Sequence, residues 1–285
     1  MADASPELQV RPLTRADLDH LVGWAEAEGW NPGTGDADAF WAADPGGFWG
    51  GELDGELVAT VSLVRHGPEF GFVGFYIVRP DLRGAGHGLA LWRAVVDASP
   101  ITTLGLDGVP DQEANYERSG FVLAHRNARY TGTPTGSAAA GAPVAVDALT
   151  VPWEQLTAFD AAHAAAPREA FLRPWLHGTG RVARAVLGAD GALRGYAAGR
   201  PGSDAHRIGP LFAQDTEVAE ALIRALADAI DGPIAVDVPL ANAEAVALAE
   251  RLGLTPAFQT ARMYRGPDPG LPVGRIYGLT SLELG

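Results

Sequence analysis

Apolar residues recur with two different spacings along the chain, and these spacings predict where strands and helices lie. In the first half, apolar positions at helical spacing follow a capping threonine, Thr14, and predict a helix that ends near Glu28. Asp54-Gly55 predicts a hairpin turn between two strands. The pattern predicts strands over residues 8–13, 47–53, 56–66, 70–79, 101–106 and 121–130, and further helices over 38–43, 88–98 and 110–119.

The second half repeats the same order of elements, which indicates an internal duplication. The pattern predicts strands over 181–187, 193–200, 206–212, 234–238 and 257–264, and helices over 216–230 and 242–252. Short sequence matches recur at a constant offset: Glu117-Arg118-Ser119-Gly120-Phe121 matches Glu250-Arg251-Leu252-Gly253-Leu254, and Ala128-Arg129-Tyr130 matches Ala261-Arg262-Met263.

A small, uncharged segment divides the chain nearly in half. Residues 133–143 are rich in alanine, glycine, serine and proline, which is typical of a linker or an exposed connection. We therefore expect an N-terminal domain over residues 1–132 and a C-terminal domain over 144–285. The expected fold class is α+β, with a mixed sheet in each half.

Composition and charge exclude several classes of function. The 285 residues include no cysteine, which excludes disulfides, zinc–thiolate sites and thiol nucleophiles, and no metal site is expected. No apolar run is long enough to cross a membrane, and residues 1–7 do not resemble a secretory signal, so we expect a cytoplasmic protein. The net charge of −14 argues against a nucleic-acid partner. An acidic surface would suit a cationic acceptor, although it is also a common source of solubility.

The most informative stretch is a glycine-rich turn between a strand and a helix. After the strand that ends at Val78-Arg79-Pro80 comes Arg83-Gly84-Ala85-Gly86-His87-Gly88. Three glycines remove side chains that would keep an anion away from the backbone. The free N–H groups of the turn and of the first helical turn then predict a diphosphate site. Neither the Walker pattern nor the dinucleotide pattern fits this spacing.

The pattern Arg-x-x-Gly-x-Gly after Val-x-Pro resembles motif A of the GNAT superfamily of acyl-CoA N-acyltransferases. Tyr116-Glu117-Arg118-Ser119-Gly120-Phe121 similarly resembles its motif B. The resemblance implies two GNAT-like domains, each a mostly antiparallel sheet with flanking helices and a splayed central strand pair. It also implies acetyl-CoA as co-substrate. The residues that it assigns to the cofactor are Tyr76, Ile77 and Val78 on the strand, and Arg83, Gly84, Ala85, Gly86, His87, Gly88 and Leu89 on the turn and the helix start.

The whole chain is also similar to a bacterial group of double-GNAT proteins. The segments that carry this likeness are Gly29-Trp30-Asn31-Pro32-Gly33, Phe171-Leu172-Arg173-Pro174-Trp175-Leu176, Ile208-Gly209-Pro210-Leu211-Phe212 and Ser281-Leu282-Glu283-Leu284-Gly285. The implied reaction is direct attack of a primary amine, on a small molecule or a peptide, on the acetyl thioester. The alternatives are a non-catalytic acyl-CoA-binding or regulatory module, or another nucleotide at the same turn. The sequence predicts no oligomeric state.

The resemblance places Tyr116 beside the cofactor sulfur, where its hydroxyl could protonate the departing thiolate. The general base is left open between Glu69, at the start of the strand that leads to the turn, and Asp107, at the end of the neighbouring strand. Trp30, Asn31 and Asp44 are the candidate acceptor residues. The other aromatic residues nearby suit either a cage for an amine or a packing surface: Trp24, Phe40, Trp41, Phe48 and Trp49.

The second half lacks the features that predict a cofactor site in the first. The duplication offset takes Tyr116 to Ala249, and no glycine-rich turn follows the strand near Ile208. Asp215 and Glu217 would repel a diphosphate there. The second half is therefore expected to be a degenerate copy that walls the acceptor site. Three arginines in it are expected to be exposed and structural: Arg168, Arg173 and Arg200.

Overall fold

A computed structural model describes residues 7–285. The first half begins with a strand, two helices and an antiparallel hairpin, and continues through a strand–helix–strand–helix–strand series. Its elements are β1 (Gln9–Pro12), α1 (Arg15–Ala27), α2 (Asp36–Ala43), β2 (Phe48–Leu53), β3 (Glu56–Arg65), β4 (Phe70–Val78), α3 (His87–Trp92), β5 (Thr103–Gly108), α4 (Glu113–Arg118) and β6 (Val122–Gly132).

The second half repeats this order and adds a short strand at the end. Its elements are β7 (Ala145–Asp147), α5 (Trp153–Ala161), α6 (Glu169–His177), β8 (Val182–Leu187), β9 (Leu193–Arg200), β10 (His206–Ala213), α7 (Thr216–Ala227), β11 (Ile234–Pro239), α8 (Ala243–Arg251), β12 (Thr255–Arg265) and β13 (Ile276–Gly278). The expected α+β class and the duplication of the element order are confirmed.

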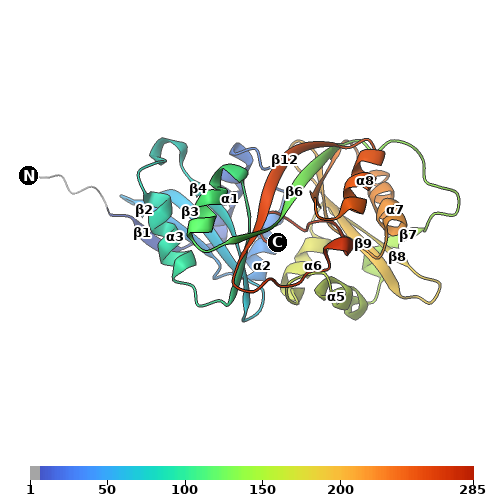
Figure 1. Cartoon of the computed structure of the whole chain (residues 1–285), viewed down its shortest axis with the longest axis horizontal. Coiled ribbons are helices and arrows are strands. Elements are labelled where there is room, and N and C mark those ends of the chain that lie inside the picture. Colours follow the sequence, from blue (N-terminus) through green and yellow to red (C-terminus); the bar gives the residue numbers. More distant parts are fainter. Residues whose placement is uncertain (1–6) are drawn as a thin grey trace, which may run out of the picture.

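The thirteen strands of residues 7–285 belong to one continuous sheet, because the two halves exchange a strand. The sheet order is β1-β2-β3-β4-β5-β12-β6-β11-β10-β9-β8-β7, with β13 against β10. Strand β12 of the second half pairs with β5 of the first, and β6 of the first pairs with β11 of the second. These two long strands lie side by side in the middle of the molecule (Figure 1). The sequence repeat did not predict this exchange, because a strand's own pattern does not name its partner.

The central parallel pair of each half is splayed, as the resemblance implied. In the first half, β4 and β5 pair only from Phe70–Thr103 to Val73–Leu106. In the second half, β10 and β11 pair only from His206–Ile234 to Ile208–Val236. Beyond these points the neighbouring strands separate, and each half contains a gap in its sheet.

Helix boundaries follow local chemistry, and two of them differ from the prediction. Thr14 and Asp17 form a capping box at the start of α1. The helix expected over 88–98 is α-helical only from His87 to Trp92 and continues as a π-helical turn. The helix expected over 110–119 begins with a 3₁₀ turn over Pro110–Gln112, and its α-helical part starts at Glu113.

A buried core joins the halves and contains unusual ion pairs. Asp36 of α2 pairs with Arg181 at 2.8 Å and with Arg200 of β9 at 3.0 Å. The prediction that Arg168 and Arg200 are exposed is wrong, because they are 9% and 2% exposed and Arg168 pairs with Asp160 at 2.9 Å. Each of these arginines contacts a buried carboxylate, with Asp36 shared between Arg181 and Arg200, and such pairing lowers the cost of burying an arginine.

Candidate active site

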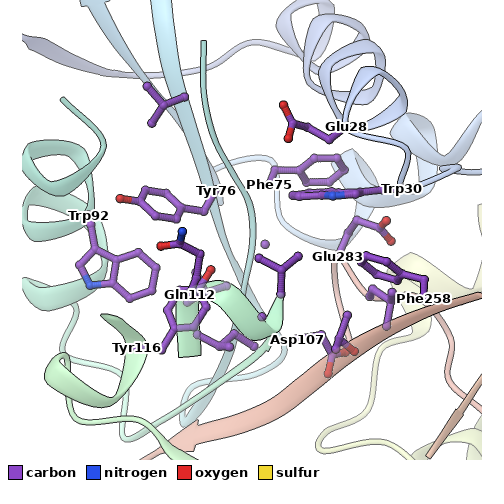
Figure 2. Close-up of a pocket in the computed structure, with 18 of the residues that line it drawn as sticks. Glu28, Trp30, Phe75, Tyr76, Trp92, Asp107, Gln112, Tyr116, Phe258 and Glu283 are labelled. Atoms are coloured by element: carbon purple, nitrogen blue, oxygen red, sulfur yellow. The ribbon is translucent and has the colours of Figure 1, made fainter. Parts of the chain in front are cut away.

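A cavity of about 350 Å³ opens where β4 and β5 separate. Its walls come from β4 (Val73 to Val78), from β5 and the segment after it (Leu106 to Val109), and from α4. Residues from the second half close the other side, among them Phe258 and Glu283 (Figure 2). The splay thus gives an elongated ligand access to the backbone edges of both strands.

Strand β4 is irregular where it borders the cavity. The pairing of β3 with β4 shifts by one residue between Thr60 and Ser62, which places a bulge near Phe75. Phe75 has φ of 45°, a conformation that is rare for an aromatic residue. Its carbonyl accepts a hydrogen bond from Thr60 Oγ1 at 2.8 Å, which stabilises this geometry. The bulge turns β4 away from β5 and so helps to open the cavity.

The glycine-rich turn follows β4 and leads into α3. Gly84 and Gly86 have φ of 81° and 90°, and a Cβ on either would point into open space. Gly88 is different: it is buried, and a Cβ there would lie 2.7 Å from both Tyr76 Oη and Val78 Cγ2. The turn therefore offers an exposed, uncovered backbone beside a tightly packed helix start, which is the arrangement that suits a diphosphate.

The remaining candidates for the cofactor occupy several different positions. Tyr76, Val78 and Arg83 line the cavity, whereas the side chain of Ile77 is buried in the core on the other face of β4. The Arg83 guanidinium forms an ion pair with Glu28 and donates to the carbonyl of Val78 at 3.0 Å. The other turn residues, Ala85, His87 and Leu89, lie outside the cavity wall on the exposed or half-buried side of the turn.

Tyr116 lies inside the cavity, at the end formed by α4. Its ring lies 5.6 Å from that of Trp92, and it packs so closely on Gly108 that a Cβ there would lie 2.3 Å from Tyr116 Cε2. Burial, and to a smaller degree Tyr76, raises the pKa of Tyr116 well above its ordinary value. The raised pKa keeps the hydroxyl protonated at neutral pH, and within residues 7–285 it has no hydrogen-bond partner, so it is free to donate to a ligand in the cavity.

The two candidate bases differ in their access to the cavity. Asp107 lines it, but its carboxylate accepts bonds from Arg262 at 2.7 and 2.6 Å and from Asn127 at 2.8 Å. Glu69 is exposed at the opposite end of β4 and is not part of the cavity wall. The structure therefore brings Asp107 and Tyr116 together, but not Glu69.

Of the three acceptor candidates, only Trp30 lines the cavity. The Asn31 side chain donates to the carbonyl of Ala205 at 3.2 Å and accepts from the Ser203 N–H at 2.8 Å, so it holds the two halves together. Asp44 is buried beside Arg65, which it contacts at 2.7 Å. Burial alone would raise the pKa of Asp44, but its bonds from Arg65 lower it. Asn31 and Asp44 therefore have structural contacts away from the cavity.

Comparison with known proteins identifies the family. A profile described as "Acetyltransferase (GNAT) family" matches residues 15–121, and one described as "Acetyltransferase (GNAT) domain" matches 156–278. The chain is 34% identical to the holothin acyltransferase of Pseudoalteromonas sp. (strain SANK 73390) over 278 residues, which cover 96% of this chain and 94% of that protein. The chain belongs to the GNAT family of acyltransferases, and it contains two GNAT domains.

Solved structures share the fold at low sequence identity. A putative acetyltransferase from Pyrococcus horikoshii superposes with a TM-score of 0.82 at 18% identity, covering 100% of this chain and 98% of that one. A tandem GNAT protein from the clavulanic acid biosynthesis pathway superposes with a TM-score of 0.63 at 19% identity, covering 92% of this chain and 100% of that one. These likenesses show that the arrangement of two GNAT domains recurs in other proteins.

The second GNAT domain has a splay that its own chain fills. Strand β13 pairs with β10 through Leu211–Gly278 and Phe212–Ile276, and the Leu279 N–H donates to the Asp237 carbonyl of β11 at 2.8 Å. The chain therefore bridges both strands of the gap. At the start of α7, Asp215 accepts from the Val218 N–H at 2.9 Å, so a carboxylate already occupies the place of an anion.

Sequence reasoning missed several cavity residues, among them Glu28, Gln112, Phe258 and Thr260. It also missed Glu283. Glu283 lies in the segment after β13, which runs from the second GNAT domain to the first. The segment touches β4 at Gly74, where a Cβ would lie 2.1 Å from the Glu283 carbonyl oxygen. Glu283 stands in a motif, Ser281-Leu282-Glu283-Leu284-Gly285, that sequence analysis had used only for the family resemblance. Its proximity to Tyr116 depends on tertiary structure.

Two further searches cover the described residues only. In residues 7–285, no helix is long and apolar enough to cross a membrane. The same residues contain no group of three or more histidine, aspartate or glutamate side chains placed to hold a metal ion.

Proposed function

We propose that this GNAT protein transfers an acetyl group from acetyl-CoA to a primary amine, and that it binds the cofactor only in its N-terminal half. The observation that carries the proposal is the continuity of three features. The splay beyond Val73 and the side chain of Tyr116 line one cavity, and Arg83, which lines the same cavity, leads directly into the uncovered turn at Gly84 and Gly86.

The residues present fit such a ligand. The open backbone from Gly84 to Gly88 would hold the diphosphate, and the β4 backbone beside Tyr76 and Val78 would bond to the pantetheine arm as an extra strand does. Bound acetyl-CoA supplies an activated thioester. Backbone N–H groups near Ile77 would stabilise the developing oxyanion, and Tyr116 would donate a proton to the departing sulfur.

A small molecule is the better-supported acceptor. The cavity is only about 350 Å³ and is lined by residues of both GNAT domains, with Trp30, Phe258 and Leu282 as apolar walls. The relative from Pseudoalteromonas is named as a holothin acyltransferase. These apolar walls favour an amine with an aromatic or otherwise apolar body.

Two measurements test the proposed function: the binding of acetyl-CoA and its turnover with an amine. Titration calorimetry with acetyl-CoA should give one site per chain, because β13 fills the second splay. Release of free CoA thiol should then be measured over a panel of amines that includes holothin, benzylamine and lysine peptides. Two sites would contradict single-site binding, and tight binding without turnover of any amine would support a non-catalytic module instead.

A further inference from the structure

We propose that Glu283 is the general base that accepts the proton of the acceptor amine. Glu283 belongs to the second GNAT domain but lines the cavity of the first. This inference rests on the proposed function and names the residue that completes it. Figure 2 shows Glu283 beside Trp30 and Phe258, across the cavity from Tyr116. The acceptor would then lie between a proton acceptor on one side and a proton donor on the other.

Elimination among the cavity's carboxylates favours Glu283. Three acidic residues line the cavity: Glu28, Asp107 and Glu283. Glu28 is paired with Arg83, and both oxygens of Asp107 are bonded to Arg262. A carboxylate held by an arginine is a poor base, because the ion pair stabilises its charged form. Within residues 7–285, Glu283 takes part in no ion pair, and its Oε2 is buried without a hydrogen-bond partner.

The segment that carries Glu283 is held firmly, as a catalytic group requires. The His66 ring lies 3.1 Å from the Leu284 carbonyl through Nε2, and Arg168 donates to the Gly285 carbonyl at 3.1 Å. The Leu284 N–H donates to Ser281 Oγ at 3.0 Å. Together with the contact at Gly74, these bonds fix the backbone on both sides of Glu283.

The surroundings of the Glu283 carboxyl raise its pKa, which favours proton transfer from an amine. Burial raises the pKa of Glu283 above its ordinary value, although Arg207, Arg200 and Arg129 act in the opposite direction. A glutamate with a raised pKa is a stronger base than an exposed one. The charged groups packed around it are Asp36 on α2, Arg129 on β6, Arg200 on β9, Arg207 on β10 and Asp237 on β11. The other charged and titratable groups around the cavity are Glu28, Tyr76, Arg83, Asp107 and Tyr116.

The proton and electron balance is complete with these residues. The amine nitrogen donates its electron pair to the thioester carbon, a C–N bond forms, and the C–S bond breaks with its pair on sulfur. The nitrogen loses one proton to the Glu283 carboxylate, and the sulfur gains one from Tyr116. Transfer of the proton from Glu283 to Tyr116 through solvent restores both groups, so the products are an amide and a free thiol.

Glu283→Gln is the direct test, because it keeps the shape of the side chain and removes its basicity. The rate kcat with acetyl-CoA and the best amine of the panel should fall by about 10²–10⁴. The acidic limb of the pH profile of kcat/KM should disappear, and the acetyl-CoA dissociation constant should stay within about threefold. Glu250→Gln, on the exposed face of α8, is the matched control and should change neither rate nor profile.

Two further measurements keep the proposal falsifiable if Glu283→Gln folds poorly. Glu283→Asp retains the buried charge but withdraws the carboxyl, so kcat should still fall at least tenfold while the thermal midpoint stays near that of the wild type. Difference infrared spectroscopy should show a carboxyl group that titrates above the ordinary range of glutamate, and its band should shift in frequency in the aspartate variant.

The possible results distinguish a failure of the role proposed for Glu283 from a failure of the proposed function. Wild-type kcat in Glu283→Gln or Glu283→Asp, or the absence of the high-titrating carboxyl band, would overturn the role of Glu283 while leaving acyl transfer intact. Failure of the wild-type protein to bind acetyl-CoA would instead overturn the proposed function. A purely structural Glu283 would lower the thermal midpoint of the aspartate variant without changing its pH profile.

Discussion

Gly74 of β4 and Glu283 lie in direct contact across the two GNAT domains, and the contact leaves no room for a side chain. A Cβ on Gly74 would stand 2.1 Å from the Glu283 carbonyl oxygen. Backbone cannot yield as a flexible side chain can, so Gly74→Ala must displace the segment that carries Glu283. We expect kcat to fall at least tenfold and the free energy of unfolding to fall by about 1–3 kcal/mol.

The measurements are kcat, acetyl-CoA affinity and urea unfolding of Gly74→Ala. Acetyl-CoA affinity should change little, because the turn at Gly84 and Gly86 is untouched. Gly23→Ala is the control, because Gly23 lies in α1 and a Cβ added to it would point into open space. Alanine there should stabilise the helix by about 0.5–1 kcal/mol. Full activity in Gly74→Ala would show that the segment's position does not matter.

The sequence was sufficient for features encoded by neighbouring residues. The Gly84–Gly88 turn, the Thr14 cap, the Asp54-Gly55 hairpin and the splayed strand pair each follow from local chemistry or from a motif, and the structure contains all four. The family and the tandem organisation followed from the same motifs, since a motif specifies a fold through contacts that are short in sequence.

What the sequence could not predict depends on contacts between distant segments. The exchange of β6 and β12 depends on which sheet edge is free, and both strands have the same kind of pattern. Asn31 and Asp44 look like pocket residues from their positions, yet they bond to Ser203 and Arg65. Glu283 reaches the cavity from the other end of the chain, and no spacing in the sequence links it to Tyr116.

Replacing a glycine of the turn should show whether the open backbone binds the cofactor, provided that the effect on affinity is distinguished from the stability cost of backbone strain. Gly86→Ala places a methyl group in the open space where the diphosphate is proposed to bind, so the acetyl-CoA dissociation constant should rise at least tenfold. The positive φ of Gly86 also costs about 1–2 kcal/mol for any residue with a Cβ. Gly191→Ala is the matched control, because Gly191 has a similar φ of 78° and open surroundings far from the turn. Calorimetry should find equal strain in both variants but weaker binding only in Gly86→Ala.

The His66 imidazole predicts a specific pH dependence of stability. Burial, with a smaller effect of Arg168, lowers the pKa of His66 to about 4. An unfolded chain takes up a proton at this histidine near pH 6.5, whereas the folded chain stays neutral until about pH 4. The unfolded state therefore binds more protons in this window, and the free energy of unfolding should fall as the pH drops from about 6.5 to 4, by up to about 3 kcal/mol.

Urea unfolding at pH 7.5 and pH 5 checks this dependence. His66→Gln keeps an amide donor for the Leu284 carbonyl but does not titrate, so its stability should change less between the two pH values. An equal pH slope in the variant would assign the effect to other groups, of which the half-buried His125 is one.

Tyr116→Phe tests the proton donor while keeping the ring that packs on Gly108 and Trp92. Because the hydroxyl has no partner within residues 7–285, its loss should cost little stability, whereas kcat should fall by about 10²–10⁴ if it protonates the departing sulfur. Tyr130→Phe, a buried tyrosine of β6 outside the cavity, is the matched control and should keep the wild-type rate. A Tyr116→Phe rate within about threefold of wild type would remove the acid role, since that change is smaller than any general acid is expected to produce. Glu283 would then have to act with a thiolate that leaves unprotonated.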